Sequence, residues 1–183
     1  MNILSWGRKT GKTDFCINRY MEIENGVLFT LNEPMCNVAK TRLKRLNIST
    51  KNVYSAPSNK WWDVVDENVV AFIDDAGLID ECVLSDILQC FNVDTITVTR
   101  TYDKDEFNHP LIQLAKKHGF YNKSIYDMDS ILPDERAMYK ERLSETQFNQ
   151  EIMAQLISDS YTWRRFKALY CKGVSPPITL YSF

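Results

Sequence analysis

The residues Gly11, Lys12 and Thr13, within the stretch SWGRKTGKTDF, have the types and order that end a phosphate-binding loop. The usual pattern is G-x-x-x-x-G-K-[ST]. Here Trp6 stands where the first glycine is expected, and Gly7 follows one residue later. In such loops backbone N–H groups and a helix N-terminus hold phosphate, the lysine reaches the β- and γ-phosphates, and the hydroxyl binds Mg²⁺. The pattern predicts a nucleotide site, and a basic surface turn that happens to spell GKT is the alternative.

A pair of carboxylates, Asp74 and Asp75, directly follows the apolar run VVAFI. A nucleotide hydrolase needs a carboxylate at a strand end beside the loop to hold Mg²⁺, and Asp74 fits that position. The next residue often activates the attacking water and is usually glutamate, whereas Asp75 is one methylene shorter. Two solvated aspartates at a strand end are the alternative. Taken with the loop, the pair predicts a nucleoside-triphosphate site that uses Mg²⁺.

A polar strand end, TVTRTYD, comes next along the chain. After the Asp74 strand it would lie near the γ-phosphate, where Thr99 or Thr101 could sense that group. Arg100 could add positive charge to the transition state, in its own subunit or across a subunit boundary. A strand that is rich in threonine because threonine favours strands is the alternative.

The elements that must position these residues alternate between strand and helix. Apolar or β-branched runs predict strands in the stretches 2–6, 26–31, 69–77 and 94–101, with 51–57 as a strand or an extended loop. Helical spacing predicts helices at 14–24, 32–48, 80–90 and 109–120, with Asn32 as a cap and Pro34 in a first turn. This alternation predicts an α/β fold around a mostly parallel sheet, and the unbroken apolar run suits its centre.

Two of these helices have expected inner faces. For the helix at 32–48 we expect Met35, Val38, Ala39, Leu43 and Leu46. For the helix at 80–90 we expect Cys82, Val83, Ile87 and Leu88. From Asp134 onward no strand-like run appears, and this segment predicts two or three helices, with a capping-box pattern that begins at Ser144. We therefore expect an ATPase core at 1–132 and a helical appendage at 133–183.

Composition is ordinary for a globular protein: 183 residues, 44% hydrophobic and 25% charged, with a net charge of −2. No global basic field indicates nucleic-acid binding, so a DNA contact would need a local patch or an assembly. The five cysteines form no C-x-x-C pair; we expect reduced thiols in a cytoplasmic protein, with Cys16, Cys82 and Cys90 in the core. Neither a zinc site nor a membrane span is expected.

The order of these pieces resembles the ATPase domain of the large terminase subunit, the motor that packages DNA into tailed-phage heads. That family often has a loop of the form R-x-x-G-K-[ST], which RKTGKT matches with Arg8. The stretch VVAFIDDAG resembles its Walker B strand, although the family normally has Asp-Glu. The segments GVLFTLNEPMCNVAKTRLKRL, ITVTRTYDKDEFNHPLIQLAKKHGF and ERLSETQFNQEIMAQL resemble its second strand and helix, its coupling motif and its closing helices.

This resemblance implies a P-loop ATPase with roles for particular residues. The nucleotide would be bound by Gly7, Arg8, Lys9, Thr10, Gly11, Lys12 and Thr13. Thr13 and Asp74 would hold Mg²⁺, Asp75 would be the catalytic carboxylate with Arg8 and Lys12 assisting, and Thr99 would couple hydrolysis to motion. Six residues precede Gly7, so no adenine-binding segment is expected before the loop. The helical residues 133–183 leave no room for the family's nuclease domain.

The leading interpretation is an ATPase that moves double-stranded DNA, as a homo-oligomeric ring, with a viral portal or capsid protein as a possible partner. It would work in the host cytoplasm. Two basic groups could face DNA, or be solvated surface: Lys40, Arg42, Lys44 and Arg45, and Arg164, Arg165 and Lys167. The Trp61-Trp62 pair could stack on a base or pack inside. A nucleotide or metabolite kinase and a non-hydrolysing nucleotide-binding assembly factor are the other hypotheses.

Overall fold

The computed structural model describes residues 1–7, 9–98, 110–119, 121–128 and 131–153. The chain divides into two compact units. One comprises Met1–Asn2 and Gly11–Val98, and the other comprises Ile3–Thr10 and Thr99–Phe183. The two units are described one after the other.

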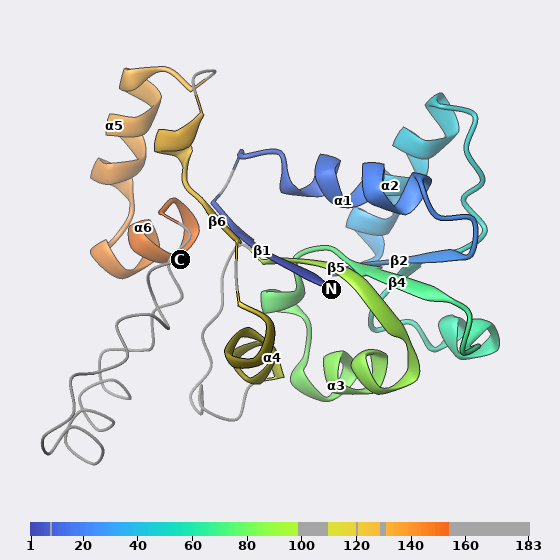
Figure 1. Cartoon of the computed structure of the whole chain (residues 1–183). Coiled ribbons are helices and arrows are strands. Elements are labelled where there is room, and N and C mark those ends of the chain that lie inside the picture. The colour runs from blue at the N-terminus through green and yellow to red at the C-terminus, as the bar shows by residue number, and fades with distance from the viewer. Residues whose placement is uncertain (8, 99–109, 120, 129–130, 154–183) are drawn as a thin grey trace, which may run out of the picture. The chain divides into compact units, whose positions relative to one another are not determined.

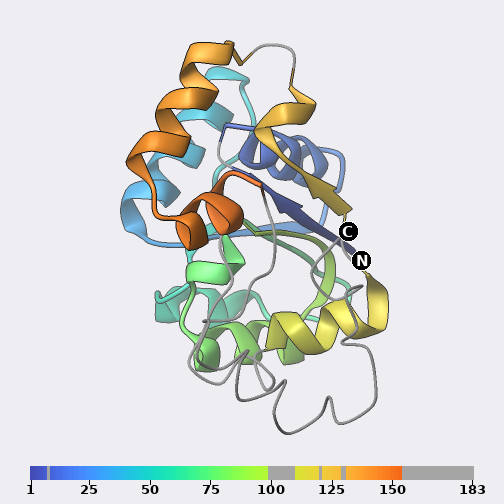
Figure 2. The same cartoon turned by 90° about the vertical axis from the view of Figure 1, so that its left-hand side faces the viewer.

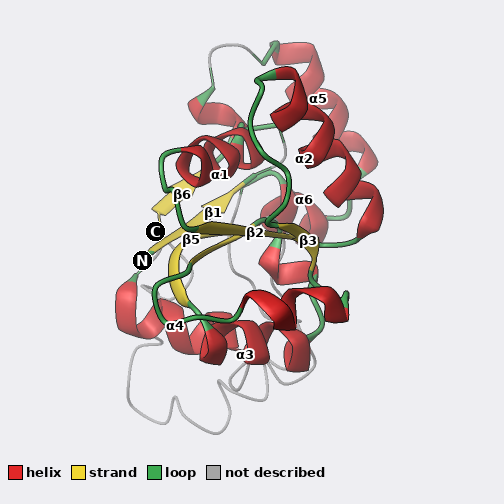
Figure 3. Cartoon of the chain, turned by 90° about the vertical axis from the view of Figure 1, so that its right-hand side faces the viewer, coloured by secondary structure: helices red, strands yellow, loops and turns green. Residues whose placement is uncertain are grey.

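The first unit is built on four parallel strands. Their order in the sheet is β3 (Val53–Ser55), β2 (Gly26–Thr30), β4 (Val70–Ile73) and β5 (Asn92–Val98). The helices α1 (Lys12–Met21) and α2 (Glu33–Arg45) cover one face, and α3 (Glu81–Cys90) covers the other (Figure 1 and Figure 3). This arrangement of parallel strands flanked by helices confirms the predicted α/β class, and the stretch at 51–57 does form a strand.

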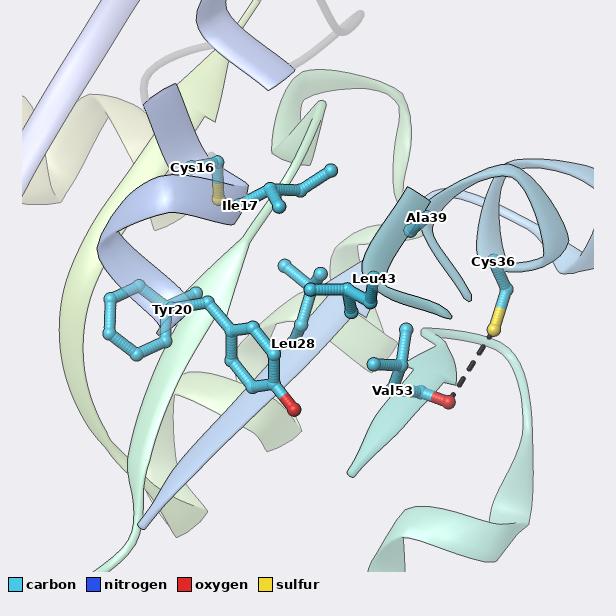
Figure 4. Close-up of a cluster of buried hydrophobic side chains, with 9 residues drawn as sticks. Cys16, Ile17, Tyr20, Leu28, Cys36, Ala39, Leu43 and Val53 are labelled. Carbon is cyan, nitrogen blue, oxygen red and sulfur yellow. Dashed lines mark hydrogen bonds between the residues drawn. The ribbon is translucent and has the colours of Figure 1, made fainter. Parts of the chain in front are cut away.

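Two cores form because successive side chains of β2 and β4 point to opposite faces. On the α1 and α2 side, Leu28 and Phe72 pack in a buried cluster with residues of both helices and β3 (Figure 4). The ring of Phe72 also meets Tyr20 edge-on at 6.0 Å. On the other side Phe29 packs against Trp61 and Phe91 at 5.6 and 5.4 Å. Each fully buried side chain of this size stabilises the fold by about 1.5–3 kcal/mol, so both faces of the sheet are firmly covered.

The inner faces of α2 and α3 differ from the expected ones. In α2 the buried residues are Cys36, Ala39 and Leu43, whereas Val38 and Leu46 are 50% and 56% exposed. A helix that lies on a sheet buries only a narrow stripe, so apolar residues outside it remain at the surface. Asn32 caps α2 by accepting the N–H of Met35 at 3.0 Å, as predicted, and Pro34 lies in the first turn.

In α3 the prediction of a buried Cys82 was wrong. The buried residues are Leu84 and Ile87, Cys82 is exposed, and Cys90 is half-buried. Asp80 caps this helix by accepting the N–H groups of Cys82 and Val83 at 3.0 and 3.3 Å. The cap sets where the helix begins, and the packing of α3 on the sheet selects which residues are buried. Cys82 consequently lies on the solvent side.

The second unit pairs β1 (Asn2–Trp6) with β6 (Tyr121–Lys123) in parallel, so that Leu4 lies opposite Tyr121 and Trp6 opposite Lys123. The three-residue strand β6 was not predicted, because so short a polar run carries no period-2 signal. The helices of this unit are α4 (Pro110–His118), α5 (Pro133–Arg142) and α6 (Glu145–Glu151).

The helices α5 and α6 pack together (Figure 2). Ile131 and Ile152 form the buried centre of this helical part, and Phe148 packs against them. Ser144 accepts the N–H of Gln147 at 3.3 Å and completes the predicted capping box. The predicted boundary between residues 132 and 133 stays a prediction. None of the helices within the described part of the chain has the length and apolar content that crossing a bilayer requires.

Candidate phosphohydrolase site

The carboxyl ends of β4 and β5 bring Asp74 and Thr97 together. These strands are parallel, with Ile73 opposite Ile96, so the next residue of each strand falls at the same level. The hydroxyl of Thr97 donates a hydrogen bond to Oδ1 of Asp74 at 2.6 Å. The backbone of Asp74 is fixed as well, because its N–H donates to the carbonyl of Phe29 in β2 at 2.8 Å. The sheet therefore sets the position of this carboxylate.

Thr13, the second residue of α1, donates its hydroxyl hydrogen to the other oxygen, Oδ2, of Asp74 at 2.9 Å. Both oxygens of this carboxylate thus accept a threonine hydroxyl, in a residue that is only 3% exposed. Burial raises the pKa of Asp74, and the nearby charge of Asp75 raises it further. The hydrogen bonds from Thr97 and Thr13 and the charge of Lys12 act in the opposite direction on this pKa.

Asp75 follows in a left-handed backbone conformation, with φ 56° and ψ 42°. Its backbone N–H donates to the Thr97 hydroxyl oxygen at 3.0 Å. Its carboxylate lies 3.6 Å from the ammonium of Lys12, and Lys12 is 9% exposed as a whole. Non-glycine residues in this backbone region are uncommon and concentrate at functional sites. The structure thus brings Lys12, Thr13, Asp75 and Thr97 into one network around Asp74.

Gly11 begins helix α1 in a left-handed conformation, with φ 80°. A Cβ atom placed on Gly11 would find nothing within 4 Å, so the backbone here is open to an approaching group. The first N–H groups of a helix have no partner within it and carry partial positive charge. The start of α1 therefore suits a phosphate, and Lys12 and Thr13 occupy its first two positions.

The front half of the loop lies in the second unit. The N–H of Gly7 donates to the carbonyl of Lys123 at 2.8 Å and extends the pairing of β1 with β6. The hydroxyl of Thr10 donates to the carbonyl of Gly7 at 2.6 Å. Lys9 has a left-handed backbone, with φ 60°. Among the described residues of the loop before Gly11, the chain therefore turns away from β1 at Lys9. Gly7 instead adds one backbone hydrogen bond beyond the end of β1.

The side chain of Lys9 is bound by α5. Its ammonium pairs with the carboxylate of Glu135 and lies 5.8 Å from the ring centre of Tyr139. The hydrogen bond with Glu135 raises the pKa of Lys9, and Tyr139 adds to that effect. A phosphate that engages Lys9 would have to compete with these two side chains.

Several predicted residues lie outside the described residues. These are Arg8, Thr99, Arg100, Thr101 and the basic group Arg164, Arg165 and Lys167. Of the α2 cations, Lys40 and Lys44 are four residues apart and share one side of the helix. Arg42 lies elsewhere and pairs with Asp14 of α1. The α2 cations thus do not form one continuous stripe.

The two tryptophans have different environments. Trp61 is 3% exposed, and its ring nitrogen donates to the carbonyl of Ala56 at 3.0 Å. Trp62 stacks on it at 4.3 Å and is 48% exposed. Both lie in the short helix η1 (Asn59–Val64). The expectation of buried packing is confirmed for Trp61 and holds only in part for Trp62.

The residues present fit Mg²⁺ held jointly with a triphosphate. Mg²⁺ commonly takes one or two carboxylates and several water or phosphate oxygens, so a dense ligand cluster is not required. Asp74 and the Thr13 hydroxyl offer oxygen ligands side by side. Within the described residues no group of three or more His, Cys, Asp or Glu side chains could hold a metal by itself. A metal here would therefore depend on its phosphate partner.

Thr97 is the residue that sequence reasoning missed. Attention fell on Thr99 and Thr101 because they stand at the strand end. Thr97 is 0% exposed and reads as an ordinary strand threonine. The signal that could have found it is the parallel register: a residue of β5 beside Asp74 must lie within hydrogen-bonding reach of it.

Scanned against known protein families, the chain matches none, and a search of characterised proteins by sequence found no match. A search of solved structures found the large terminase of a thermophilic bacteriophage, with a TM-score of 0.61 and 11% sequence identity. The alignment covers 84% of this chain and 47% of that one, so this chain spans about half the length of that terminase. The likeness shows that the two share an α/β fold.

Proposed function

We propose that this chain is a Mg²⁺-dependent nucleoside-triphosphate hydrolase, with ATP as its expected nucleotide, of the terminase-like kind that drives DNA packaging. The observation that carries the proposal is the network around Asp74, which joins Thr13 and Thr97 to that carboxylate. The same network places Asp75 beside Lys12. A hydroxyl, two carboxylates and an ammonium beside a helix N-terminus are the groups that phosphoryl transfer to water requires.

Each group has a distinct task in this proposal. The N–H groups from Gly11 onward would bind phosphate oxygens, and the ammonium of Lys12 would pair with the β- and γ-phosphates. Thr13 and Asp74 would hold Mg²⁺, which supplies neutralisation of phosphate charge when bound. Asp75 would accept a hydrogen bond from the attacking water and orient it toward the γ-phosphate. Arg8 and Thr99 keep their proposed roles in catalysis and coupling.

The proposed partner is double-stranded DNA, moved by a homo-oligomeric ring that docks on a viral portal or capsid protein in the host cytoplasm. The shared fold with a phage large terminase supports this choice. The sequence pattern RKTGKT supports it too, because an arginine three places before the glycine marks the terminase form of the loop. With a net charge of −2, affinity for DNA would depend on local cations and on ring assembly.

ATP turnover measured with and without double-stranded DNA tests the proposal directly. Hydrolysis that DNA stimulates supports a packaging motor. Phosphate transfer to a small acceptor, with no effect of DNA, would identify a kinase instead. Tight nucleotide binding without turnover would identify an assembly factor, so each alternative has its own result.

A substitution of Lys12 links the activity to this site. Lys12→Ala should weaken ATP binding by about 30-fold or more, the usual effect of removing one partner of a buried charge pair. Lys60→Ala is the matched control, since Lys60 is exposed and lies on η1. Equal binding by the two variants would show that the nucleotide binds elsewhere.

A further inference from the structure

One hydroxyl group connects the two aspartates of the candidate site. Thr97 donates to Oδ1 of Asp74 at 2.6 Å and accepts the backbone N–H of Asp75 at 3.0 Å. A hydroxyl offers one hydrogen and two lone pairs, so these bonds use its hydrogen and one lone pair. The residue is 0% exposed, so water does not compete for either bond. Thr97 thus links the side chain of Asp74 to the backbone of Asp75 inside the protein.

The first bond fixes the orientation of the Asp74 carboxylate. Without it, that carboxylate would keep, among side chains of the described residues, the hydroxyl of Thr13 at 2.9 Å on Oδ2. The Thr13 hydroxyl is also a proposed ligand of Mg²⁺. Once it binds the metal, it no longer fixes the orientation of Asp74 by itself. Thr97 has no other task in the proposed site. Such supporting hydrogen bonds typically orient the groups that bind a metal.

The second bond fixes the backbone of Asp75. Its left-handed conformation, with φ 56°, is a minority conformation for a residue other than glycine. A backbone in such a region persists when surrounding contacts hold it, and the Thr97 hydroxyl is one such contact. The direction in which the Asp75 side chain leaves β4, toward Lys12, depends on that backbone.

We propose that Thr97 is a positioning residue that sets both carboxylates at once, Asp74 for the metal and Asp75 for the attacking water. This inference rests on the proposed hydrolase function. Thr97 would touch neither nucleotide nor metal and would act through the two aspartates. Its loss should therefore lower turnover and metal use while leaving the phosphate loop able to bind nucleotide.

Thr95 provides a matched control on the same strand. It is two residues away on the same side of β5, it is 0% exposed, and its hydroxyl donates to Oδ1 of Asp94 at 2.6 Å. Thr95→Val and Thr97→Val therefore each remove a hydrogen bond from a buried threonine to an aspartate; this bond is part-buried for Thr95 and buried for Thr97. Of the two, only Thr97 bonds to an aspartate of the candidate site.

The test compares Thr97→Val, Thr97→Ser and Thr95→Val. For Thr97→Val we expect a 10- to 100-fold loss of kcat and a higher Mg²⁺ concentration for half-maximal ATP turnover, of about the same factor. Binding of ATP in the presence of EDTA should stay within about twofold, because Lys12 and Gly11 are untouched. Thr97→Ser keeps the hydroxyl and should restore turnover. Hydrogen exchange at the amide of Asp75, measured without nucleotide, should become faster in Thr97→Val alone.

Two results would overturn the inference while the proposed function stands. One is that the wild-type protein hydrolyses ATP, while Thr97→Val and Thr95→Val hydrolyse it at the same rate as each other. The other is Thr97→Ser as impaired as Thr97→Val; because serine keeps the hydroxyl, the effect would then come from side-chain packing at this position and not from the hydrogen bonds. A wild-type protein that neither binds nor hydrolyses ATP would remove the proposed function itself and the positioning role with it. The exchange rate at Asp75 separates these cases, because it reports the bond without nucleotide.

Discussion

The ammonium nitrogen of Lys12 lies 3.6 Å from a carboxylate oxygen of Asp75, and the two side chains are 10% and 18% exposed. In this weakly solvated position the pair interacts more strongly than it would in water. Both residues have other tasks in the proposed reaction, Lys12 on phosphate and Asp75 on water. A phosphate that binds Lys12 would therefore weaken this ion pair, so in the proposed reaction nucleotide binding and the Asp75 carboxylate compete for the same ammonium.

Asp75→Asn should separate binding from hydrolysis. The amide removes the charge that competes with phosphate for Lys12, so ATP affinity should stay equal or rise. Turnover should fall by about 10²- to 10⁴-fold, the usual contribution of a positioned acid or base. Calorimetric titration gives the affinity and single-turnover assays give the rate. Turnover within tenfold of the wild-type rate would place the catalytic carboxylate elsewhere.

Asp75→Glu tests why this chain has an aspartate where the resembling family normally has glutamate. Asp and Asn adopt the left-handed backbone of residue 75 more readily than longer side chains do. Glutamate should therefore cost about 1 kcal/mol, which lowers the Tm by about 2–4 °C in a chain of this size. Asp75→Asn and Asp75→Gln form the control pair, because their side chains also differ by one methylene but carry no charge. If the wild-type protein and Asp75→Glu have the same Tm, and Asp75→Asn and Asp75→Gln also have the same Tm, the backbone explanation is contradicted.

Much of the fold could be predicted because its signals are local. The unbroken apolar run before Asp74 and the alternation of strands and helices identify a parallel sheet covered on both faces. The loop and the aspartates could also be predicted, since parallel strands carry such groups at their carboxyl ends. Asn32 and Ser144 marked two helix starts through their own side-chain hydrogen bonds.

The rest depends on contacts between distant parts of the chain. The strand β6 exists because β1 offers it a partner, and its own three residues carry no pattern. Exposure of Cys82 follows from where α3 lies on the sheet, which apolar spacing alone does not fix. The role of Thr97 follows from the register between β4 and β5. Each of these became visible only when the pairing of the strands was known.

Gly11→Ala should impair both stability and nucleotide binding. The φ of 80° strains any residue with a Cβ, although the space around it is open, so unfolding should become easier by about 1–2 kcal/mol. Gly119→Ala is the matched control, with φ 77° and equally open surroundings. Chemical denaturation should show a similar loss for both variants. Only Gly11→Ala should weaken ATP binding, and an equal loss of binding in both would remove the special role of Gly11.

Asp74→Asn should make the nucleotide-free protein more stable at neutral pH. Burial raises the pKa of Asp74, so the folded protein holds this proton more tightly than the unfolded chain, and ionisation costs stability. That cost is absent below the unfolded pKa of about 4, grows as pH rises through the folded pKa, and is complete above it. The variant should have a higher Tm than the wild-type protein at pH 7, measured in EDTA. A gain that persists unchanged at pH 3.5 would show another cause.

Glu135→Gln should raise ATP affinity with little effect on stability. Glu135 binds the ammonium of Lys9, and Lys9 belongs to the proposed phosphate loop, so the variant frees a cation for phosphate. Because solvent screens an exposed ion pair, its loss should change stability little, and the gain in affinity should reach about fivefold at most. Titration with ATP measures the affinity, and thermal unfolding measures the stability.

Glu141→Gln is the control for this last change. Glu141 is exposed on the same helix, α5, and its substitution removes the same charge. Titration with ATP at low salt and at about 1 M salt should show the gain for Glu135→Gln only at low salt, because salt screens exposed charges. The same gain from Glu141→Gln would mean that general charge, and not the contact with Lys9, controls affinity. If instead the gain is specific, the contact of Glu135 with Lys9 competes with ATP for that lysine.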